Sequence, residues 1–365
     1  MDARRGLIIE VIYAPLIGGS ETLAFTLCQQ WKHEGIPTRI ACLQERTGAM
    51  TAKFEEAGLA YDLLDLGGQP VWRRIVRLAR YFMKWRPRAI HVHHFGSLVN
   101  VLPAAWLAGC FNVVYTEHSA YHIARTRWMQ RVLPIFSYCV RKVTCVSNRL
   151  VEFLGDELGV PTRKLVTVYN GVDTRRFRPA RSSDKTPREV LRIGAVGRLV
   201  EEKDYPTLLQ AFALLKQRGV PFEGVIVGDG PLAPQLKAQA QALGLDNVEF
   251  LGRREDVPEI MRDLDIYVLA SKSEGMPIAV LEAMATALPI VSTAVDAVPE
   301  VIVHDVNGIL VEKGNPEALA GGLERALGDP ELRRRLGHVA LTDVRALFSI
   351  ENTTQLYAEY LGITP

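Results

Sequence analysis

The sequence is poor in cysteine and lacks the cysteine pairs that staple small secreted domains or bind zinc. Its 365 residues include five cysteines, at positions 28, 42, 110, 139 and 145. None belongs to a C-x-x-C pair, and an odd number cannot all pair within one chain. We therefore expect no disulfide framework and no zinc site, and a reducing compartment fits the composition best.

The sequence also lacks an apolar run that could cross a bilayer, which takes about 20 residues. The one uncharged stretch of that length, residues 95–116, contains two asparagines, a proline and two glycines. It reads as a helix over 98–108 followed by a strand over 113–116. Near the N-terminus, Glu10 interrupts the apolar run that follows the basic residues, so we interpret that run as a buried strand rather than a signal peptide.

Repeats, low-complexity tracts and the dinucleotide fingerprint G-x-G-x-x-G are absent as well. Neither Gly18-Gly19-Ser20 nor Gly228-Asp229-Gly230-Pro231 completes that fingerprint. Its absence argues against a nicotinamide-dependent dehydrogenase.

What the chain does contain is enough apolar sequence for two domain cores. Apolar residues make up 48% and charged residues 23%, the balance of a soluble globular protein. Short runs rich in Val and Ile alternate with helix-like segments in both halves, which predicts two parallel sheets covered by helices on both faces. The predicted strands are residues 6–13, 38–44, 89–93, 113–116, 142–146, 191–197, 223–227, 248–251, 266–269 and 289–293.

A polar segment with two prolines, residues 178–188, separates the halves and predicts a linker. We expect one domain over residues 1–178 and another over 189–348. A final helix should follow over 349–361. Ligands of open parallel sheets bind at the carboxyl ends of the strands, so a cleft between the domains is the expected site.

The net charge of +2 conceals a strong asymmetry between the halves. Residues 1–180 hold 24 Lys and Arg against 14 Asp and Glu, whereas residues 181–365 hold 19 against 27. A basic half beside an acidic half suggests that the first half meets something anionic. Ordinary surface charge is the alternative.

One predicted helix in the basic half carries both a basic and an apolar face. The basic residues recur every three or four positions, at Arg73, Arg77, Arg80, Lys84 and Arg88. The apolar face comprises Trp72, Ile75, Val76, Ala79, Phe82 and Met83. This pattern is typical of a helix lying on a membrane surface, or of a core-facing helix whose basic face is solvated.

Two groups of residues at predicted strand ends in the second half could carry chemistry. After the strand at 266–269 come Glu274, Gly275 and a helix that starts near Pro277 and contains Glu282. The free N–H groups at the start of this helix suit a diphosphate, and the two carboxylates suit sugar hydroxyls. After the strand at 191–197, Arg198 and Lys203 could neutralise a diphosphate without a metal. Helix-dipole carboxylates and solvated cations are the alternative interpretations.

The first half adds weaker candidates. Gly18 and Gly19 open a helix directly after a strand, where glycine would let the backbone approach a ligand. His118 also ends a strand and should face the cleft, although a lone histidine is usually structural. His91, His93 and His94 have metal-like spacing, but no carboxylate accompanies them in the sequence, so we expect no metal site.

Taken together, these motifs resemble glycosyltransferase family 4. The resemblance covers nearly the whole chain and rests on five elements in the family's order. They are G-G-x-E at Gly18, Gly19 and Glu21, N-G-V-D at 170–173, G-R…K at Gly197, Arg198 and Lys203, G-D-G-P at 228–231, and E-x(7)-E at Glu274 and Glu282.

The resemblance implies the GT-B fold, an α/β architecture of two Rossmann-like doubly wound domains facing across a cleft. It implies a retaining enzyme that moves a hexose-type sugar from a nucleotide-diphosphate donor, UDP first and GDP second. The N-terminal domain would bind the acceptor, the C-terminal domain would bind the donor, and the final helix, within 349–365, would cross back to the N-terminal domain. No metal or other cofactor is expected.

The resemblance also implies roles for the matching residues. Arg198 and Lys203 would bind the diphosphate, Glu282 the ribose and Glu274 the transferred sugar, while His118 would lie near sugar and acceptor. Of these residues, we expect His118, Glu274, Arg198 and Lys203 to be catalytic. Further donor contacts are expected at Gly18, Gly19, Gly228, Arg253, Gly275, Met276 and Pro277.

Two segments depart from the family pattern. Ala287 stands where members often carry glycine, and Asp296-Ala297 stand where members often carry a glycine pair. The second departure puts the local loop and the sugar preference in doubt.

The basic helix directs the acceptor prediction toward a lipid-linked or polysaccharide glycan. It also predicts a cytoplasmic protein on the inner face of the cell membrane, contacting anionic lipid through Arg73, Arg77, Arg80 and Lys84 and binding no nucleic acid. A nucleotide-sugar epimerase or a glycan phosphorylase of the same fold remains open. So does a non-catalytic subunit that binds sugar or membrane, and donor turnover would decide between them.

Overall fold

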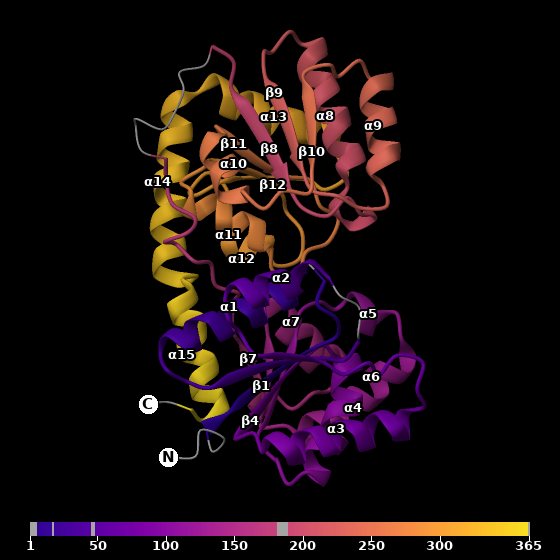
Figure 1. Ribbon diagram of the computed structural model, residues 1–365. Helices are drawn as coiled ribbons and strands as arrows, with labels where there is room; N and C mark the ends of the chain where they lie inside the picture. Colours follow the sequence, from indigo (N-terminus) through magenta and orange to yellow (C-terminus); the bar gives the residue numbers. More distant parts are fainter. Residues whose placement is uncertain (1–5, 17, 45–47, 181–188, 364–365) are drawn as a thin grey trace. The chain divides into compact units, whose positions relative to one another are not determined.

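The computed structural model describes residues 6–16, 18–44, 48–180 and 189–363, which form two compact units (Figure 1). The N-unit comprises Met1–Gly171 together with Ile350–Pro365, and the C-unit comprises Val172–Ser349. Val172 is the first residue of the C-unit, and its amide donates to the carbonyl of Phe348, 2.9 Å away. The first boundary thus lies at Gly171, not at residue 178. Most of the predicted linker, residues 181–188, lies outside the described residues.

The N-unit is built on a seven-stranded parallel sheet in the order β3-β2-β1-β4-β5-β6-β7. Its central strands are buried along their whole length, as their continuous apolar runs predict. The strands are β1 (Ile8–Ile12), β2 (Thr38–Cys42), β3 (Tyr61–Leu63), β4 (Ala89–His93), β5 (Val113–Glu117), β6 (Lys142–Cys145) and β7 (Leu165–Thr167).

Helices cover both faces of this sheet. Right-handed crossovers place α1 and α2 on one face and α3, α4, α6 and α7 on the other. On the second face α3 packs against α4, which packs against α6, as Figure 1 shows. The helices are α1 (Gly19–His33), α2 (Ala49–Glu56), α3 (Val71–Trp85), α4 (Phe95–Leu107), α5 (Tyr121–Ala124), α6 (Arg127–Cys139) and α7 (Asn148–Glu152), which continues as a π-helical turn over Phe153–Glu157.

The last helix, α15 (Ile350–Leu361), belongs to the N-unit although it follows the C-unit in sequence. It packs against α1 and buries Tyr357, Ala358 and Leu361 beside Trp31. The neighbouring Leu356, on another side of the helix, is exposed. Burying this one face ties the chain's end to the first domain.

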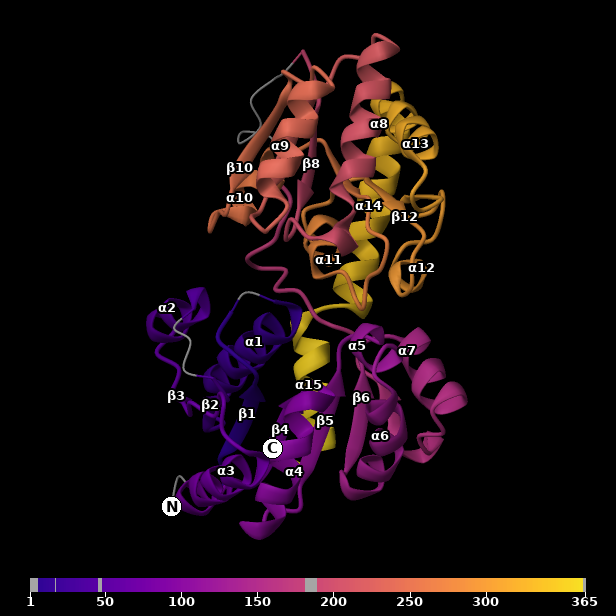
Figure 2. The ribbon, with the colours of Figure 1, turned by 90° about the vertical axis from the view of Figure 1, so that its right-hand side faces the viewer.

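The C-unit has a six-stranded parallel sheet in the order β10-β9-β8-β11-β12-β13. Figure 2 shows its helices on both sides of the strands. The strands are β8 (Arg192–Val196), β9 (Glu223–Val227), β10 (Val248–Gly252), β11 (Ile266–Leu269), β12 (Ile290–Thr293) and β13 (Ile309–Val311). The helices are α8 (Tyr205–Gln217), α9 (Ala233–Ala242), α10 (Val257–Asp263), α11 (Ile278–Ala285), α12 (Val298–Val301), α13 (Pro316–Gly328) and α14 (Pro330–Leu347).

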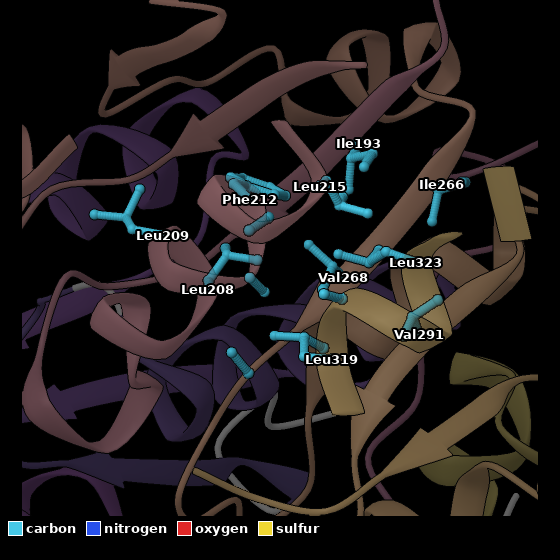
Figure 3. Close-up of a cluster of buried hydrophobic side chains, with 14 of the residues drawn as sticks. Ile193, Leu208, Leu209, Phe212, Leu215, Ile266, Val268, Val291, Leu319 and Leu323 are labelled. Atoms are coloured by element: carbon cyan, nitrogen blue, oxygen red, sulfur yellow. The ribbon is translucent and has the colours of Figure 1, made fainter. Parts of the chain in front are cut away.

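The core of the C-unit lies between this sheet and helices α8 and α13. Figure 3 shows Phe212 and Leu215 of α8 meeting Val268 of β11 and Leu323 of α13. Fully burying one such side chain stabilises the fold by about 1.5–3 kcal/mol relative to leaving it exposed. This packing holds the strand ends, and hence the loops after them, in fixed positions.

Each sheet has one point at which the chain's crossovers change direction. In the N-unit it lies between β1 and β4, and in the C-unit between β8 and β11. Open α/β sheets bind ligands at the carboxyl ends of such strands, because the loops there diverge and leave a crevice.

No helix among the described residues combines the length and the apolar content that crossing a bilayer requires.

Candidate functional site

In the C-unit, the residues predicted to bind a donor do gather at the β8–β11 crossover point. Gly197 and Arg198 follow β8, and Glu274 lies in the loop between β11 and α11. Lys203 ends a short 3₁₀ turn over Glu201–Lys203. Chain segments about 70 residues apart in sequence therefore meet at one edge of the sheet.

The centre of this group is an ion pair between Lys203 and Glu274. The Lys203 Nζ lies 2.5 Å from Glu274 Oε1, and the hydroxyl of Ser271 donates to the same oxygen, also at 2.5 Å. The Glu274 side chain is 8% exposed and that of Lys203 is 22% exposed. A partly desolvated pair of this kind is stronger than a surface pair, and either partner alone would be costly to bury. The two residues predicted to act on opposite parts of a ligand thus contact each other directly.

Asp296 holds the Glu274 loop from the neighbouring strand end. Its Oδ2 accepts from the amide of Glu274 at 2.8 Å and from the hydroxyl of Ser273 at 2.6 Å. Asp296 itself has φ +41, in the left-handed region. The residue that departs from the family's glycine therefore makes two hydrogen bonds to the loop that carries Glu274.

Two glycine-containing turns pack against each other beside the pair. A Cβ on Gly228, whose φ is +139, would lie 1.9 Å from the carbonyl oxygen of Gly197. A Cβ on Gly230 would lie 2.5 Å from that of Leu199. The G-D-G-P turn thus has a clear structural reason for its glycines, since only glycine permits this backbone approach.

The side chain of Tyr205 stabilises the turn at Gly197. Its hydroxyl donates to the carbonyl of Gly197 at 3.2 Å. Burial, together with the charge of Glu274, raises the pKa of Tyr205 well above its usual value. The phenol therefore stays protonated and keeps donating this bond.

The remaining predicted donor residues occupy the entrance of α11 and the end of β10. Helix α11 begins at Ile278, so Pro277 is its N-cap residue and not a residue of the first turn. No side chain makes a capping hydrogen bond to this helix. Met276 is buried, and Glu282 lies within the helix, half-buried. Arg198 and Arg253 are both exposed, and neither forms an ion pair with another described residue.

In the N-unit, a glycine and several histidine and carboxylate side chains lie at the crossover point between β1 and β4. Gly18 precedes α1 in extended conformation. His94 follows β4, and His118 follows the adjacent β5. All three lie at the carboxyl ends of neighbouring strands.

His94 has a strained backbone, with φ +66 and ψ 140, a region that non-glycine residues rarely adopt. Its Nε2 lies 2.9 Å from the Ser20 hydroxyl of α1, and its Nδ1 lies 3.4 Å from Glu117 Oε1. Its ring packs against that of His118, with centroids 4.9 Å apart and ring planes tilted by 50°. Burial lowers the pKa of His94, but the bond and charge of Glu117 outweigh it, so the net pKa is raised.

A second, fully buried group lies behind His118. Glu10 of β1 reaches His91 and His93 of β4: Oε1 is 2.9 Å from His91 Nδ1, and Oε2 is 2.8 Å from His93 Nε2. His93 Nδ1 then lies 2.9 Å from His118 Nε2. His91 instead meets the hydroxyl of Thr116 at 2.6 Å.

This group corrects the expectation that no carboxylate accompanies the histidines. The sequence places Glu10 some 80 residues away, but β1 and β4 are adjacent and in register, with Glu10 opposite His91. Glu10, which in the sequence only interrupts the first apolar run, is thus a member of the cluster.

Burial sets the protonation of this cluster. Burial alone would raise the pKa of Glu10, but the charges and hydrogen bonds of His91 and His93 lower it below its usual value. Burial lowers the pKa of His93 to about 4 and that of His118 well below its usual value. Near neutral pH the carboxylate is therefore ionised, whereas His93 and His118 are neutral.

Glu10, His91 and His93 have the ligand types of a metal site, and their candidate ligand atoms all lie within 4.8 Å of one another. Zinc would need bonds of about 2.0–2.2 Å to nitrogen and oxygen. Here the carboxylate oxygens face the ring nitrogens directly at hydrogen-bonding distance, and the outer nitrogens have their own partners. The group is a complete hydrogen-bonded cluster, and the expectation of no metal stays a prediction.

Helix α3 differs in part from its predicted faces. Leu78, Ala79 and Phe82 form its buried side, whereas Trp72 is 62% exposed and Met83 48% exposed. The sequence assigned Trp72 and Met83 to a single apolar face together with Phe82. The basic residues Arg73, Arg77, Arg80 and Lys84 are all exposed, as predicted.

Sequence reasoning missed several residues that the structure brings into these groups. Ser20, Glu117 and Ser271 are common types at strand and helix ends, and nothing in their spacing distinguishes them. Asp296 was noted in the sequence as a departure from the family's glycine, but its hydrogen bonds to Glu274 and Ser273 were not predicted.

Two family models match the chain. The model of Glycosyl transferases group 1 matches residues 176–341, and that of Glycosyltransferase Family 4 matches residues 17–176.

Individual relatives match over different lengths. The UDP-Gal:alpha-D-GlcNAc-diphosphoundecaprenol alpha-1,3-galactosyltransferase of Escherichia coli is 26% identical over 345 residues, 89% of each chain. The N-acetyl-alpha-D-glucosaminyl L-malate synthase of Bacillus anthracis is 30% identical over 59% of this chain and 58% of its own length.

Solved structures share the fold. HepE of Anabaena, in complex with UDP and glucose, has a TM-score of 0.86 at 20% identity, with 98% of this chain and all of that chain covered. The lipopolysaccharide outer core galactosyltransferase WaaB has a TM-score of 0.75 at 17% identity over 98% of this chain and 99% of its own. The fold is therefore GT-B, as predicted. The two family matches together span residues 17–341, so both units are similar to glycosyltransferases.

Proposed function

We propose that the chain is a retaining glycosyltransferase that moves a hexose-type sugar from a nucleotide-diphosphate donor to a lipid-linked or polysaccharide acceptor. UDP is the first expectation for the donor nucleotide and GDP the second. The observation that carries the proposal is the Lys203–Glu274 pair at the carboxyl end of the C-unit sheet, beside the exposed Arg198.

This arrangement suits a nucleotide sugar because it offers cations and a hydroxyl acceptor side by side. Arg198 makes no ion pair with another described residue, and its planar guanidinium fits phosphate oxygens. Lys203 adds a second positive charge within the same loop. Glu274 keeps one carboxylate oxygen for a sugar hydroxyl while its other oxygen binds Lys203 and Ser271. The uncapped N-terminus of α11 follows directly and favours negative charge.

The retaining course is taken from the family resemblance, and the bonds of Glu274 support a course without a covalent enzyme intermediate. Its Oε1 already accepts two short hydrogen bonds, which makes the carboxylate a weak nucleophile. Attack by the acceptor on the face that the diphosphate leaves avoids a covalent enzyme intermediate. The anomeric carbon–phosphate oxygen bond breaks, the bond to the acceptor oxygen forms, and the acceptor's proton passes to the leaving phosphate oxygen. The protein then acts by positioning and by stabilising charge on the diphosphate.

The relatives support the choice of substrates without fixing it. The Escherichia coli relative uses UDP-Gal and a diphosphoundecaprenol acceptor, and HepE was solved with UDP and glucose. The Bacillus anthracis relative is named for L-malate, so acceptors differ among relatives. A lipid-linked acceptor is favoured here by the basic face of the N-unit.

That face is wider than the single helix α3. Between residues 66 and 151 the sequence holds thirteen Lys and Arg but only one acidic residue, the buried Glu117. This stretch includes α3, α4 and α6, which pack side by side. Exposed apolar side chains accompany the charges on these helices and the loop after α4, at Trp72, Val76, Met83, Trp106, Leu107, Phe111, Trp128, Ile135 and Tyr138. Basic and aromatic residues together suit the headgroup region of an anionic bilayer on the cytoplasmic side of a membrane.

A thermal-shift panel tests the donor part of the proposal. Wild type and Glu282→Ala are melted with UDP, GDP, ADP and their common sugar conjugates. A nucleotide at 100 times its Kd stabilises the folded protein by about 2.7 kcal/mol, a Tm rise of several degrees. We expect this rise with UDP in wild type and a clearly smaller one in Glu282→Ala.

Glu324→Ala is the matched control. Glu324 lies in α13 and pairs with Arg218 just after α8, at the opposite edge of the sheet. Its loss should leave the UDP shift unchanged. A panel with no shift for any nucleotide would favour a non-catalytic subunit, whereas a UDP-sugar converted without transfer to an acceptor would favour an epimerase.

A further inference from the structure

A line of three buried side chains connects the centre of the N-unit sheet to His118. Glu10, His93 and His118 come from β1, β4 and the end of β5, which are adjacent strands. The two contacts along the line are 2.8 Å, from Glu10 Oε2 to His93 Nε2, and 2.9 Å, from His93 Nδ1 to His118 Nε2. Glu10 and His93 are fully buried, and His118 is 9% exposed.

The chemistry of the groups fixes where each proton lies. An ionised carboxylate only accepts hydrogen bonds, so His93 must donate to Glu10 from Nε2. A neutral imidazole has a proton on only one of its two nitrogens, so His93 Nδ1 carries a lone pair. That lone pair accepts, so the proton in the second contact belongs to His118 Nε2.

We propose that Glu10 and His93 are positioning residues that lock His118 in the Nε2-protonated form and leave its Nδ1 as a hydrogen-bond acceptor. Nδ1 makes no hydrogen bond to any other described residue, and His118 keeps its remaining exposure at the strand end. The group that fits it is a hydroxyl donor. On the proposed function, that donor is a hydroxyl of the transferred sugar or of the acceptor.

The arrangement also supplies charge to His118 without a direct contact. His118 donates to His93 and His93 donates to the Glu10 carboxylate, so the negative charge polarises each hydrogen bond in turn. A carboxylate that orients a histidine in this way fixes its tautomer and stabilises its charged form. Here one further histidine separates the two groups.

The same cluster contains a natural control. His91 is as buried as His93, binds the other oxygen of Glu10, and packs against the His93 ring with centroids 4.3 Å apart. Its second nitrogen meets Thr116, however, and not His118. His91→Leu and His93→Leu each take one donor from Glu10, but only His93→Leu removes the acceptor of His118.

NMR on the ¹⁵N-histidine-labelled, ligand-free chain tests the proton placement. In wild type we expect a low-field proton bonded to His118 Nε2 and a scalar coupling across the hydrogen bond to His93 Nδ1. His91→Leu should keep both signals, and His93→Leu should lose both. A proton on His93 Nδ1, no coupling in wild type, or equal loss in both variants would overturn the inference. Because the wild-type spectrum by itself supports or overturns the proton placement, a variant that fails to fold does not block the test.

This spectrum needs no donor, so it separates the inference from the proposed function. If the NMR result is as expected but no nucleotide sugar is turned over, the proposed function fails while the locked His118 stands. Where turnover is measured, His93→Leu should lower kcat/KM by roughly 10- to 100-fold, the usual cost of losing an orienting partner. Activity of His91→Leu should stay near wild type, and an equal loss there would reduce His93 to a structural role.

Discussion

At the residue scale, the two departures from the family's glycines fall on strained backbone. Ala287 has φ +59 and Asp296 has φ +41, both in the left-handed region that favours glycine. An ordinary L-residue pays roughly 1–2 kcal/mol there, and aspartate less, because its side chain can hydrogen-bond locally. Asp296 recovers part of that cost through its bonds to Glu274 and Ser273. Alanine has no such side chain, and nothing in the surroundings of Ala287 explains why alanine stands here in place of glycine.

Asp296→Gly should therefore change binding more than stability. Relief of the left-handed strain offsets the loss of two hydrogen bonds of about 1 kcal/mol each, so the free energy of unfolding should stay within about 1 kcal/mol of wild type. The Glu274 loop, however, loses its anchor, and the nucleotide-sugar affinity should fall. Calorimetric titration with the donor, beside a denaturant melt, measures both.

Asp296→Asn is the matching control, since it keeps an acceptor oxygen and tolerates the left-handed region. It should bind the donor nearly as wild type does. A glycine variant with unchanged affinity would show that Asp296 does not order the loop.

Residue types alone could identify part of the candidate site. Arg198, Lys203, Glu274 and Glu282 stand at fixed offsets from strand ends, so spacing finds them. The bonds of Glu10 depend on the pairing of β1 with β4, which no local pattern reports. Within a buried strand a carboxylate looks only like an interruption.

At the element scale, α14 shows how one glycine sets a helix contact. Gly337 lies in the interior of α14, where glycine costs about 1 kcal/mol relative to alanine. A Cβ at this position would come 2.2 Å from the carbonyl oxygen of Ala287, just beyond the C-terminus of α11. The glycine is therefore retained for the close approach of α14 to the segment that follows the proposed donor helix.

Gly337→Ala should destabilise the protein by roughly 1–3 kcal/mol, because overpacking against rigid backbone exceeds the helix-propensity gain. Gly321→Ala in α13 is the opposite case. No atom lies within 4 Å of its would-be Cβ, so alanine there should stabilise by about 0.5–1 kcal/mol. Urea melts of the two variants compare them directly, and a shift of the same sign in both would contradict the packing argument.

The longer elements were predictable from the sequence, whereas the short edge strands were not. Buried runs such as β1, β9 and β11 lie within a few residues of their predicted bounds. The strands β3, β7 and β13 have three residues each and were missed. Three residues give too little periodicity to distinguish from a loop, and their pairing with a preformed sheet decides their conformation. The α3 faces were partly wrong for a similar reason, since packing on α4 decides which apolar residues are covered.

At the scale of the whole molecule, charge divides along the chain in the same way as the two units. The acid-poor stretch from residue 66 to 151 lies within the N-unit, and its one acidic residue is buried. A single-sign surface attracts an anionic partner over roughly a Debye length, about 10 Å at 0.1 M salt. The acidic C-unit offers no such attraction, so a membrane should select one unit over the other.

Replacing Arg73, Arg77, Arg80 and Lys84 by glutamine should release the protein from anionic vesicles. Each basic residue near such a surface contributes about 1 kcal/mol, so losing four should weaken partitioning by roughly a hundredfold or more.

The control removes the same charge from exposed positions of the C-unit, at Lys237, Lys313, Arg334 and Arg345. Flotation at low salt with phosphatidylserine-containing and neutral vesicles separates the cases: wild type and the control should float with the anionic vesicles alone. Equal loss in both variants would mean that net charge, and not the α3 face, drives the contact, and a wild type that ignores the vesicles would remove the membrane from the proposed function.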